Sequence, residues 1–402
     1  MKKRMIALLL CMTTILTLGA CGSNHNQGET QQGTEVQNNA GGLASADIDI
    51  DLEKQVTKLA DYKGIPLTVT GSYDVTDEEV ESNLLSLLSY YGIYGVEVKD
   101  RDTVKKEDYV LIDYSGYLDG EAFEGGTATD IMFDISNNYD LTNGSGYIDG
   151  FADGLVGAKV GEEASSDVTF PDDYNETLGG KQVVFKFDIK GIYEPITIDT
   201  LTDDIVAENF TDLNLATKKD LLSYVRDALE SQMESTKKQA GLTAAQDYML
   251  ENSTVEIPEE YMQARLAEYQ TSLERDYCSE NQTLEEYLAE NGTSIEAELE
   301  TWNEILDKQI KLEFIFGRIA ELEKIEVDED AYGEFVNYII SSNSSQMSTQ
   351  EDVYNYYGNG NKENGEKMLR ELYLVNQALS FVVDNADVTV AADTQAQEDT
   401  QE

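Results

Sequence analysis

The stretch from Tyr109 to Glu194 decides the fold of this chain of 402 residues. It opens with Tyr109-Val-Leu-Ile-Asp-Tyr-Ser-Gly116 and closes with Val183-Val-Phe-Lys-Phe-Asp-Ile189. In both runs apolar and polar residues alternate, as they do in strands of which one face is buried. Asp119-Gly120 lies directly after the first run and is a hairpin turn signal. The stretch therefore predicts an antiparallel β-sheet.

Three further blocks lie between these runs. They are Leu118-Asp-Gly-Glu-Ala-Phe-Glu-Gly125, Tyr147-Ile-Asp-Gly-Phe-Ala-Asp-Gly-Leu155 and Thr169-Phe-Pro-Asp-Asp-Tyr174. Gly150 and Gly157 bound a predicted short helix near Phe151 to Val156. In this order, the five blocks resemble an FKBP-type peptidyl-prolyl isomerase domain, in the variant found inside bacterial trigger factor. The resemblance implies an α+β fold with an antiparallel sheet wrapped on a short helix, and rotation about Xaa-Pro bonds as the reaction.

The resemblance also implies a set of catalytic residues. Tyr114, Phe123 and Phe133 would line the walls of an aromatic cup, Phe151 would form its floor and Phe187 would close its side. The remaining implied residues are Tyr147 and Ile148 just before the short helix, with the Ile148 backbone N–H as donor to a substrate carbonyl, the Tyr174 hydroxyl in a loop, and Glu124 at a position with a hydrogen-bond role in the family.

Two features depart from the family pattern. Glu124 stands where many FKBP domains have an Asp, and Asn137 to Gly146 is a few residues longer than in trigger factor. The alternative for the aromatic residues is that they only fill a core. For Phe185 and Ile189 that interpretation is the better one.

The remaining chemistry is limited by what the sequence lacks. Its one histidine is His25, so Ser-His and Cys-His nucleophilic machinery and His-based zinc sites are excluded from the folded body. No phosphate-binding P-loop or dinucleotide fingerprint is present. No cofactor and no metal are therefore expected, and prolyl isomerisation needs neither a nucleophile nor a metal.

Residues 195–388 change to a helical pattern. Three apolar stripes at helical spacing run through them, along Leu221 to Leu229, Met262 to Tyr277 and Leu299 to Ile319. Val353-Tyr-Asn-Tyr-Tyr-Gly358 and Met368-Leu-Arg-Glu-Leu-Tyr-Leu-Val375 are similar to the trigger factor chaperone domain. This implies an all-α, trigger factor C-terminal (SurA-like) domain whose arms hold non-native chains.

The chain begins with the features of a secreted lipoprotein. Lys2, Lys3 and Arg4 precede an apolar run that is too short to span a membrane, and Leu18-Gly-Ala-Cys21 resembles a bacterial lipobox. We expect a signal peptide over residues 1–20 and lipidation of Cys21. The alternative is an ordinary signal peptide with a chance cysteine.

The other segments follow from composition. Residues 21–51 are polar and predict a disordered tether. Residues 52–104 are expected to form a linker with a strand at Pro66 to Thr70 and a helix capped by Thr76. The isomerase domain spans 105–194, and residues 389–402 are an acidic tail that is expected to be disordered. Cys278, the one cysteine left after lipidation, is expected to be a packed or half-buried thiol.

Charge limits the partners. The net charge of −51 argues against nucleic acid, since no basic stripe exists to neutralise phosphates. Trigger factor begins with a ribosome-docking domain, and here the signal, lipobox and tether take that place. We therefore expect no ribosome contact, and a lipid-anchored isomerase and chaperone on the outer face of the plasma membrane that acts on unfolded or nascent secreted polypeptides. The alternatives are a non-catalytic holdase with a degenerate FKBP domain and a structural lipoprotein of the cell envelope.

Overall fold

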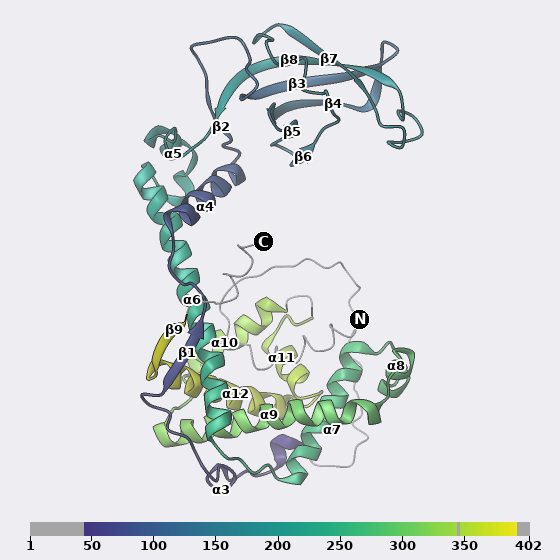
Figure 1. Ribbon diagram of the computed structural model, residues 1–402. Coiled ribbons are helices and arrows are strands. Elements are labelled where there is room, and N and C mark those ends of the chain that lie inside the picture. Colours follow the sequence, from purple (N-terminus) through teal and green to yellow (C-terminus); the bar gives the residue numbers. More distant parts are fainter. Residues whose placement is uncertain (1–43, 344–345, 392–402) are drawn as a thin grey trace. The chain divides into compact units, whose positions relative to one another are not determined.

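The computed structural model describes residues 44–343 and 346–391 (Figure 1). The signal peptide, Cys21, most of the tether and most of the tail therefore lie outside the described residues. Within the described chain two compact units separate by their contacts. One comprises residues 74–231, and the other combines residues 44–73 with residues 232–391. Each unit is described by itself below.

The unit of residues 74–231 is built on a curled antiparallel sheet. Its strands are β2 (Gly95–Glu97), β3 (Tyr109–Leu118), β4 (Glu121–Asp134), β5 (Tyr139–Asp140), β6 (Ser145–Gly146), β7 (Glu163–Thr169) and β8 (Gln182–Pro195). The order is β2-β8-β3-β4-β5-β6, and β7 also pairs with β8. The turn between β3 and β4 has positive φ at Asp119 and Gly120, which confirms the hairpin that Asp-Gly predicts.

Alternation along the strands determines the core of this sheet. Val110, Ile112 and Tyr114 of β3 are buried, and so are Phe185 and Phe187 of β8. They face one hydrophobic cluster with residues from β4, β7 and the loop around Phe151. Burial on one face is what the period-2 pattern predicts.

A helical layer completes the same unit with a second core. It consists of α4 (Asp77–Tyr90), α5 (Asp203–Asn209), the 3₁₀ turn η2 (Thr211–Leu213) and the first part of α6 (Lys218–Asn252). Thr76 and Glu79 form the predicted capping box of α4. Leu84, Leu88, Phe210 and Leu221 are almost inaccessible to solvent at the centre of this core.

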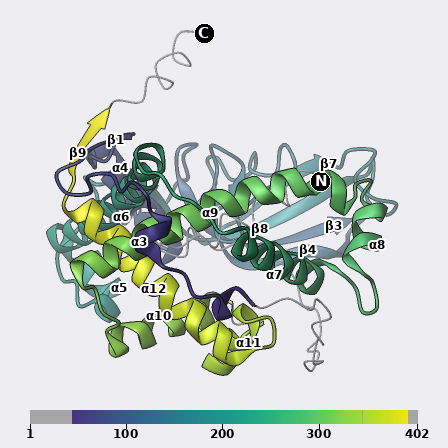
Figure 2. The same cartoon turned by 90° about the horizontal axis from the view of Figure 1, so that it is seen from below.

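The other unit is mainly helical. After η1 (Ser45–Asp47) and α3 (Leu52–Gln55) it contains the rest of α6 and a series of further helices (Figure 1). These are α7 (Glu259–Tyr277), α8 (Leu284–Glu290), α9 (Ile295–Glu323), α10 (Glu329–Ser342), α11 (Gln350–Tyr357) and α12 (Lys362–Asp384). Helix α9 packs on α7 and on α12, and Figure 2 shows these helices from below. Ile315 of α9 and Leu379 of α12 belong to the shared core.

Two segments that are far apart in the sequence form a small sheet of this unit. Strand β1 (Pro66–Thr70) pairs in parallel with β9 (Asp387–Ala391). Leu67 and Val69 of β1 are buried. Residues 389–391, which the composition assigned to the acidic tail, are therefore the end of a strand. A pairing between segments more than 300 residues apart leaves no signal in local composition.

The fold class predicted from the sequence is confirmed, since a curled antiparallel sheet precedes a helical region. One detail is wrong. Instead of a short helix, residues 149–157 form consecutive tight turns, with Phe151 N bonded to Ile148 O and Leu155 N bonded to Ala152 O. Glycines at positive φ at both ends leave room for about one turn, and the Gly154 N–H bonds a side chain instead of the preceding backbone.

Candidate functional site

An aromatic cluster forms the core of the candidate active site in the sheet. The ring of Phe151 is fully buried, and five other aromatic rings surround it. Its centroid lies 4.6 Å from that of Tyr147 and between 4.9 and 5.2 Å from those of Phe185, Phe187, Tyr114 and Phe133. Most of these pairs meet edge to face, the favourable arrangement for ring quadrupoles. The structure thus brings together five of the predicted residues, with Phe151 at the centre.

The local sequence explains how the Phe151 segment is held. The buried Ser166 hydroxyl, on β7, donates to the Phe151 carbonyl oxygen over 2.7 Å and accepts from the Gly154 N–H over 2.8 Å. A Cβ on Gly154 would lie 1.9 Å from the Ser165 carbonyl oxygen, so only glycine allows this approach. The turn that contains Phe151 and Gly154 therefore lies directly against β7. A residue larger than glycine at position 154 would prevent this close approach.

Two tyrosine hydroxyls and a carboxylate form a polar line beside the rings. The Tyr114 and Tyr147 hydroxyl oxygens lie 2.7 Å apart, and the Tyr147 hydroxyl donates to Asp140 Oδ2 over 3.0 Å. Burial, followed by these hydrogen bonds, raises the pKa of Tyr147 well above its ordinary value. Burial also raises the pKa of Tyr114. Both phenols are therefore neutral at physiological pH.

The Ile148 backbone is arranged to leave its amide available. The Asn138 side-chain amide donates to the Tyr147 carbonyl over 2.8 Å and to the Ile148 carbonyl over 3.0 Å. Within the described part of the chain, no group accepts a hydrogen bond from the Ile148 N–H. A donor with no internal partner beside the Phe151 ring fits the role that the resemblance implied.

The remaining predicted residues lie at the rim. Phe123 is partly buried and covers Gly116 and Gly126, with its ring near Phe185. Tyr174 is 56% exposed and stacks on Phe170 with centroids 4.4 Å apart. It does not join the cluster around Phe151. Glu124 is exposed on β4 and makes no hydrogen bond or ion pair with the described residues.

Sequence reasoning missed two residues of this site. Asp140 supplies the buried carboxylate, and Ser166 holds the Phe151 segment. Phe185 is buried in the core, as predicted, and its ring also contacts Phe151. The longer stretch from Asn137 to Gly146 was the one signal for Asp140. No sequence pattern marks a serine whose partner is a carbonyl 15 residues earlier.

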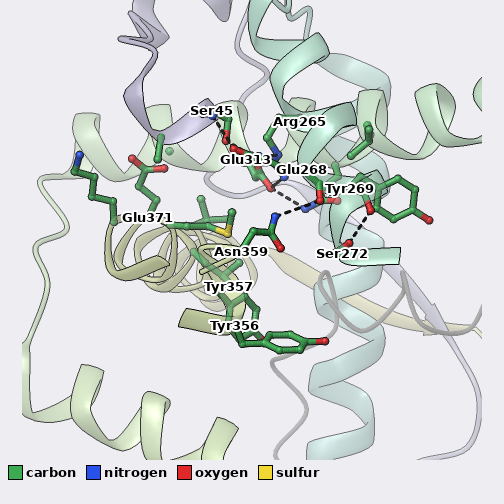
Figure 3. A pocket seen from close by; sticks show the side chains of 18 of the residues that line it. Ser45, Arg265, Glu268, Tyr269, Ser272, Glu313, Tyr356, Tyr357, Asn359 and Glu371 are labelled. Carbon is green, nitrogen blue, oxygen red and sulfur yellow. Dashed lines mark hydrogen bonds and ion pairs between the residues drawn. The ribbon is translucent and has the colours of Figure 1, made fainter. Parts of the chain in front are cut away.

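A second candidate site is a cavity of about 1300 Å³ in the helical unit. Its walls come from α7, α9, α10, α11 and α12 (Figure 3). Arg265 is buried there and pairs with Glu313, and the Arg275 guanidinium lies 3.8 Å from the centre of the Tyr356 ring. Tyr356 and Tyr357 of α11 line the cavity, whereas Tyr354 is buried against Tyr332.

A segment of the chain itself lies in part of this cavity. The Ser45 N–H and hydroxyl both donate to the Glu268 carboxylate over 2.7 Å. Ile48, Ile50 and Leu52 then pack among Leu306, Phe314 and other apolar residues from α7 and α9. Alternate apolar side chains of an irregular segment thus contact the wall. Residues 45–51 are the end of the stretch for which the polar composition predicts a disordered tether.

Two other features concern chemistry and environment. Cys278 is half-buried, as predicted, and burial raises the pKa of its thiol, which opposes a reactive thiolate. None of the helices among the described residues combines the length and apolar character needed to cross a membrane.

Comparison with known protein families agrees with the two-part reading of the sequence. The family described as FKBP-type peptidyl-prolyl cis-trans isomerase matches residues 100–190, and the bacterial trigger factor protein (TF) C-terminus matches residues 217–384. A solved structure, "Promiscuous Substrate Recognition in Folding and Assembly Activities of the Trigger Factor Chaperone", aligns over 81% of this chain and 72% of its own, with 15% identity and a TM-score of 0.43.

Several similar proteins are trigger factors. Trigger factor from Desulforamulus reducens is 32% identical over 76% of this chain, that from Halothermothrix orenii 33% over 69%, and that from Shouchella clausii 31% over 69%. The chain covers 67%, 62% and 61% of the length of these proteins. On this identity and coverage, the chain belongs to the trigger factor family.

Proposed function

We propose that this chain catalyses cis-trans isomerisation of Xaa-Pro bonds in unfolded polypeptides and holds such polypeptides while they fold. The main observation in favour of isomerase activity is that the Phe151 ring lies at the centre of five aromatic rings. These rings belong to the region that matches FKBP-type isomerases. Beside the Phe151 ring, the Ile148 N–H donates no hydrogen bond to any of the described residues.

The chemistry suits such a site. The barrier to rotation about a peptide bond is about 18–20 kcal/mol and comes from amide resonance. The twisted amide has lost conjugation and is less polar than the planar one, so a dry aromatic surface favours it relative to water. The Ile148 N–H would hold a flanking carbonyl of the peptide, and the rings would take the proline. No proton transfer and no covalent intermediate are needed.

The enzymatic proposal is tested by exchange NMR on an Xaa-Pro peptide. Wild type should speed exchange over the uncatalysed rate, and Phe151→Leu and Tyr114→Ala should each lower kcat/KM by about tenfold or more. Tyr90→Ala, at an 86% exposed position of the same unit, is the control. If wild type matches the background rate, the chain is a non-catalytic holdase and the isomerase proposal is wrong.

The chaperone half rests on the cavity in the helical unit. What supports it is that an irregular piece of polypeptide, Ser45 to Leu52, already lies against its wall through the apolar side chains of Ile48, Ile50 and Leu52. Clients would be unfolded segments with apolar side chains at every second position. Burial of such side chains contributes about 25 cal/mol for each Å² of apolar surface.

Aggregation suppression tests the cavity. The full chain should slow aggregation of a denatured model protein, and Met368→Glu, on the cavity wall, should weaken this effect. Leu322→Glu, at a 46% exposed position of the same unit outside the cavity lining, should not. Equal suppression by both variants would place client binding elsewhere.

The proposed place of action is the outer face of the bacterial plasma membrane, where the chain would be held by lipid on Cys21. The lipobox-like Leu18-Gly-Ala-Cys21 supports this, and the net charge of −51 makes ribosomal RNA an unsuitable partner. Newly secreted polypeptides would be the clients. Cys21→Ala should move the protein from the membrane fraction to the soluble fraction. A protein that stays cytosolic in wild type would contradict the proposal.

A further inference from the structure

The inference concerns Asp140, a carboxylate that the isomerase proposal does not use. Asp140 lies on β5, and its solvent exposure is 0%. No Lys or Arg forms an ion pair with it among the described residues. A buried carboxylate without a cation is costly unless hydrogen bonds satisfy its oxygens. The groups that donate hydrogen bonds to the Asp140 carboxylate therefore indicate its role.

Three donors reach this carboxylate. The Asn143 backbone N–H bonds Oδ1 over 2.9 Å, and the Asn143 side-chain amide bonds Oδ2 over 2.8 Å. The third is the Tyr147 hydroxyl, 3.0 Å from Oδ2. The first two close the turn between β5 and β6. The third links that turn to the aromatic cluster.

The carboxylate determines the direction of the hydroxyl protons. An ionised carboxylate only accepts, so the Tyr147 hydroxyl must donate its proton to Asp140. The Tyr147 oxygen then accepts the proton of Tyr114, 2.7 Å away. Both protons are thereby directed along the line from Tyr114 to Asp140. The lone pairs of the Tyr114 oxygen are left for another donor.

We propose that Asp140 is a positioning residue of the isomerase site, which fixes the Tyr147 ring and makes the Tyr114 oxygen an acceptor for a backbone N–H of the bound peptide. The proposal rests on the isomerase function proposed above. Ile148 would then donate to a carbonyl of the peptide while Tyr114 accepts from an amide, so the two hold neighbouring peptide groups of opposite polarity. Asp140 does not touch the peptide and acts through Tyr147.

The exposed Glu124 does not supply the carboxylate of this arrangement. The family resemblance placed a carboxylate with a hydrogen-bond role at that position, and in this chain Glu124 has no such partner among the described residues. The β5–β6 hairpin instead brings a carboxylate to the tyrosine hydroxyls from a different strand.

Asp134 offers a matched control. It is buried like Asp140, and the Asn137 backbone N–H and side-chain amide bond its carboxylate over 3.1 and 2.7 Å, just as Asn143 bonds Asp140. Among the described residues, Asp134 forms no hydrogen bond with a tyrosine hydroxyl. Asp134→Ala therefore removes the hydrogen bonds of a similar turn. It leaves intact the hydrogen bonds that run from Tyr114 through Tyr147 to Asp140.

The test is a double-mutant cycle with kcat and KM measured separately on an Xaa-Pro peptide. Asp140→Ala should lower kcat/KM by about tenfold, the scale of one or two lost hydrogen bonds. Asp140→Asn, whose side-chain oxygen still accepts from Tyr147, should recover part of the loss, and Asp134→Ala should stay within about twofold of wild type. In a Tyr147→Phe background, Asp140→Ala should have no further effect.

Each other result counts against Asp140 as a positioning residue. Activity of Asp140→Ala within about twofold of wild type overturns the proposal, and so does an equal loss in Asp134→Ala. A full loss that persists in the Tyr147→Phe background shows that Asp140 acts only through its turn. If wild type itself is inactive, the isomerase function fails, and the ¹³C resonance of the Tyr147 Cζ decides the hydrogen-bond line alone. That resonance should shift in Asp140→Ala and not in Asp134→Ala.

Discussion

The hydroxyl of Ser166 donates a hydrogen bond of 2.7 Å to the carbonyl oxygen of Phe151. The same hydroxyl accepts from the Gly154 N–H, so one buried side chain satisfies two backbone groups of the segment that carries the central ring. The position of Phe151 thus depends on a residue of β7 that has no part in the chemistry.

Ser166→Ala should lower the free energy of unfolding by about 1–3 kcal/mol, because it leaves two buried backbone groups without their partner. It should also lower isomerase activity by loosening the Phe151 segment. Urea unfolding measures the first effect. Ser165→Ala, at the exposed neighbouring position, is the control and should change the free energy of unfolding by no more than about 0.5 kcal/mol. Equal stability of the two variants would contradict the role given to Ser166.

Gly126→Ala should reduce isomerase activity more than stability. A Cβ at this position would lie 2.6 Å from the Phe123 ring, and no other group is as near. The ring must therefore move, and Phe123 is a predicted wall of the cup. Gly146→Ala, in the same sheet with open space around the added Cβ, should behave like wild type. Unchanged kcat/KM in Gly126→Ala would show that Phe123 is not part of the site.

Much of this fold could be predicted from local patterns. Alternation in β3 and β8 gave the strands, and Asp119-Gly120 gave the hairpin, since each is a short-range signal. The pairing of β1 with β9 was not predictable, because it places residues such as Leu67 and Val388, which are more than 300 positions apart, opposite each other. The end of β9 was consequently assigned to the tail.

The candidate site could likewise be predicted only in part. Resemblance located the rings that surround Phe151, because each of them lies in a block whose order and spacing match the family. It gave no basis for choosing Asp140 over Glu124, since Asp140 lies where the family pattern has fewer residues. It also gave no signal for the segment Ser45 to Leu52, whose place in the cavity depends on a contact with Glu268 more than 200 residues away.

The buried Arg265 and the partly buried Glu313 should be strongly coupled. Arg265 Nη1 lies 2.5 Å from Glu313 Oε2, and the arginine side chain is 9% exposed. Glu313→Ala should therefore lower the free energy of unfolding by about 3–5 kcal/mol, because it leaves a buried guanidinium without its main partner. In Arg265→Met/Glu313→Leu most of this loss should be recovered. Asp247→Ala, which breaks an exposed pair with Lys308, should cost less than about 1 kcal/mol.

Alkaline pH should destabilise the chain through Tyr62. Its hydroxyl donates to Glu323 over 2.7 Å, and this hydrogen bond, followed by burial, raises the pKa of Tyr62 to about 12. The folded state thus keeps a proton that the unfolded state loses near pH 10. The stabilisation is fully present below about pH 10 and is lost as the pH rises toward about 12.

Tyr62→Phe should flatten the fall in stability between these two pH values, as measured by urea unfolding at each pH. Glu323→Gln removes the acceptor charge and should flatten it in part. Tyr62→Phe with the wild-type slope would show that the hydrogen bond to Glu323 does not persist in solution.

The segment Ser45 to Leu52 should compete with clients for the cavity, because it covers part of the apolar wall around Leu306 and Phe314. A tethered occupant acts at an effective concentration of about millimolar or more, so it reduces the apparent affinity for any client that uses the same wall.

Ile48→Asp/Ile50→Asp should release the segment and tighten binding of a fluorescently labelled unfolded polypeptide several-fold, measured by anisotropy. Asp49→Ala, between them on the exposed side, should bind as wild type does. Ser45→Ala, which removes one of the two bonds to Glu268, should tighten binding by a smaller factor without adding charge. Identical affinities in all four proteins would show that clients bind away from this wall, and the chaperone role would then lose the observation that supports it.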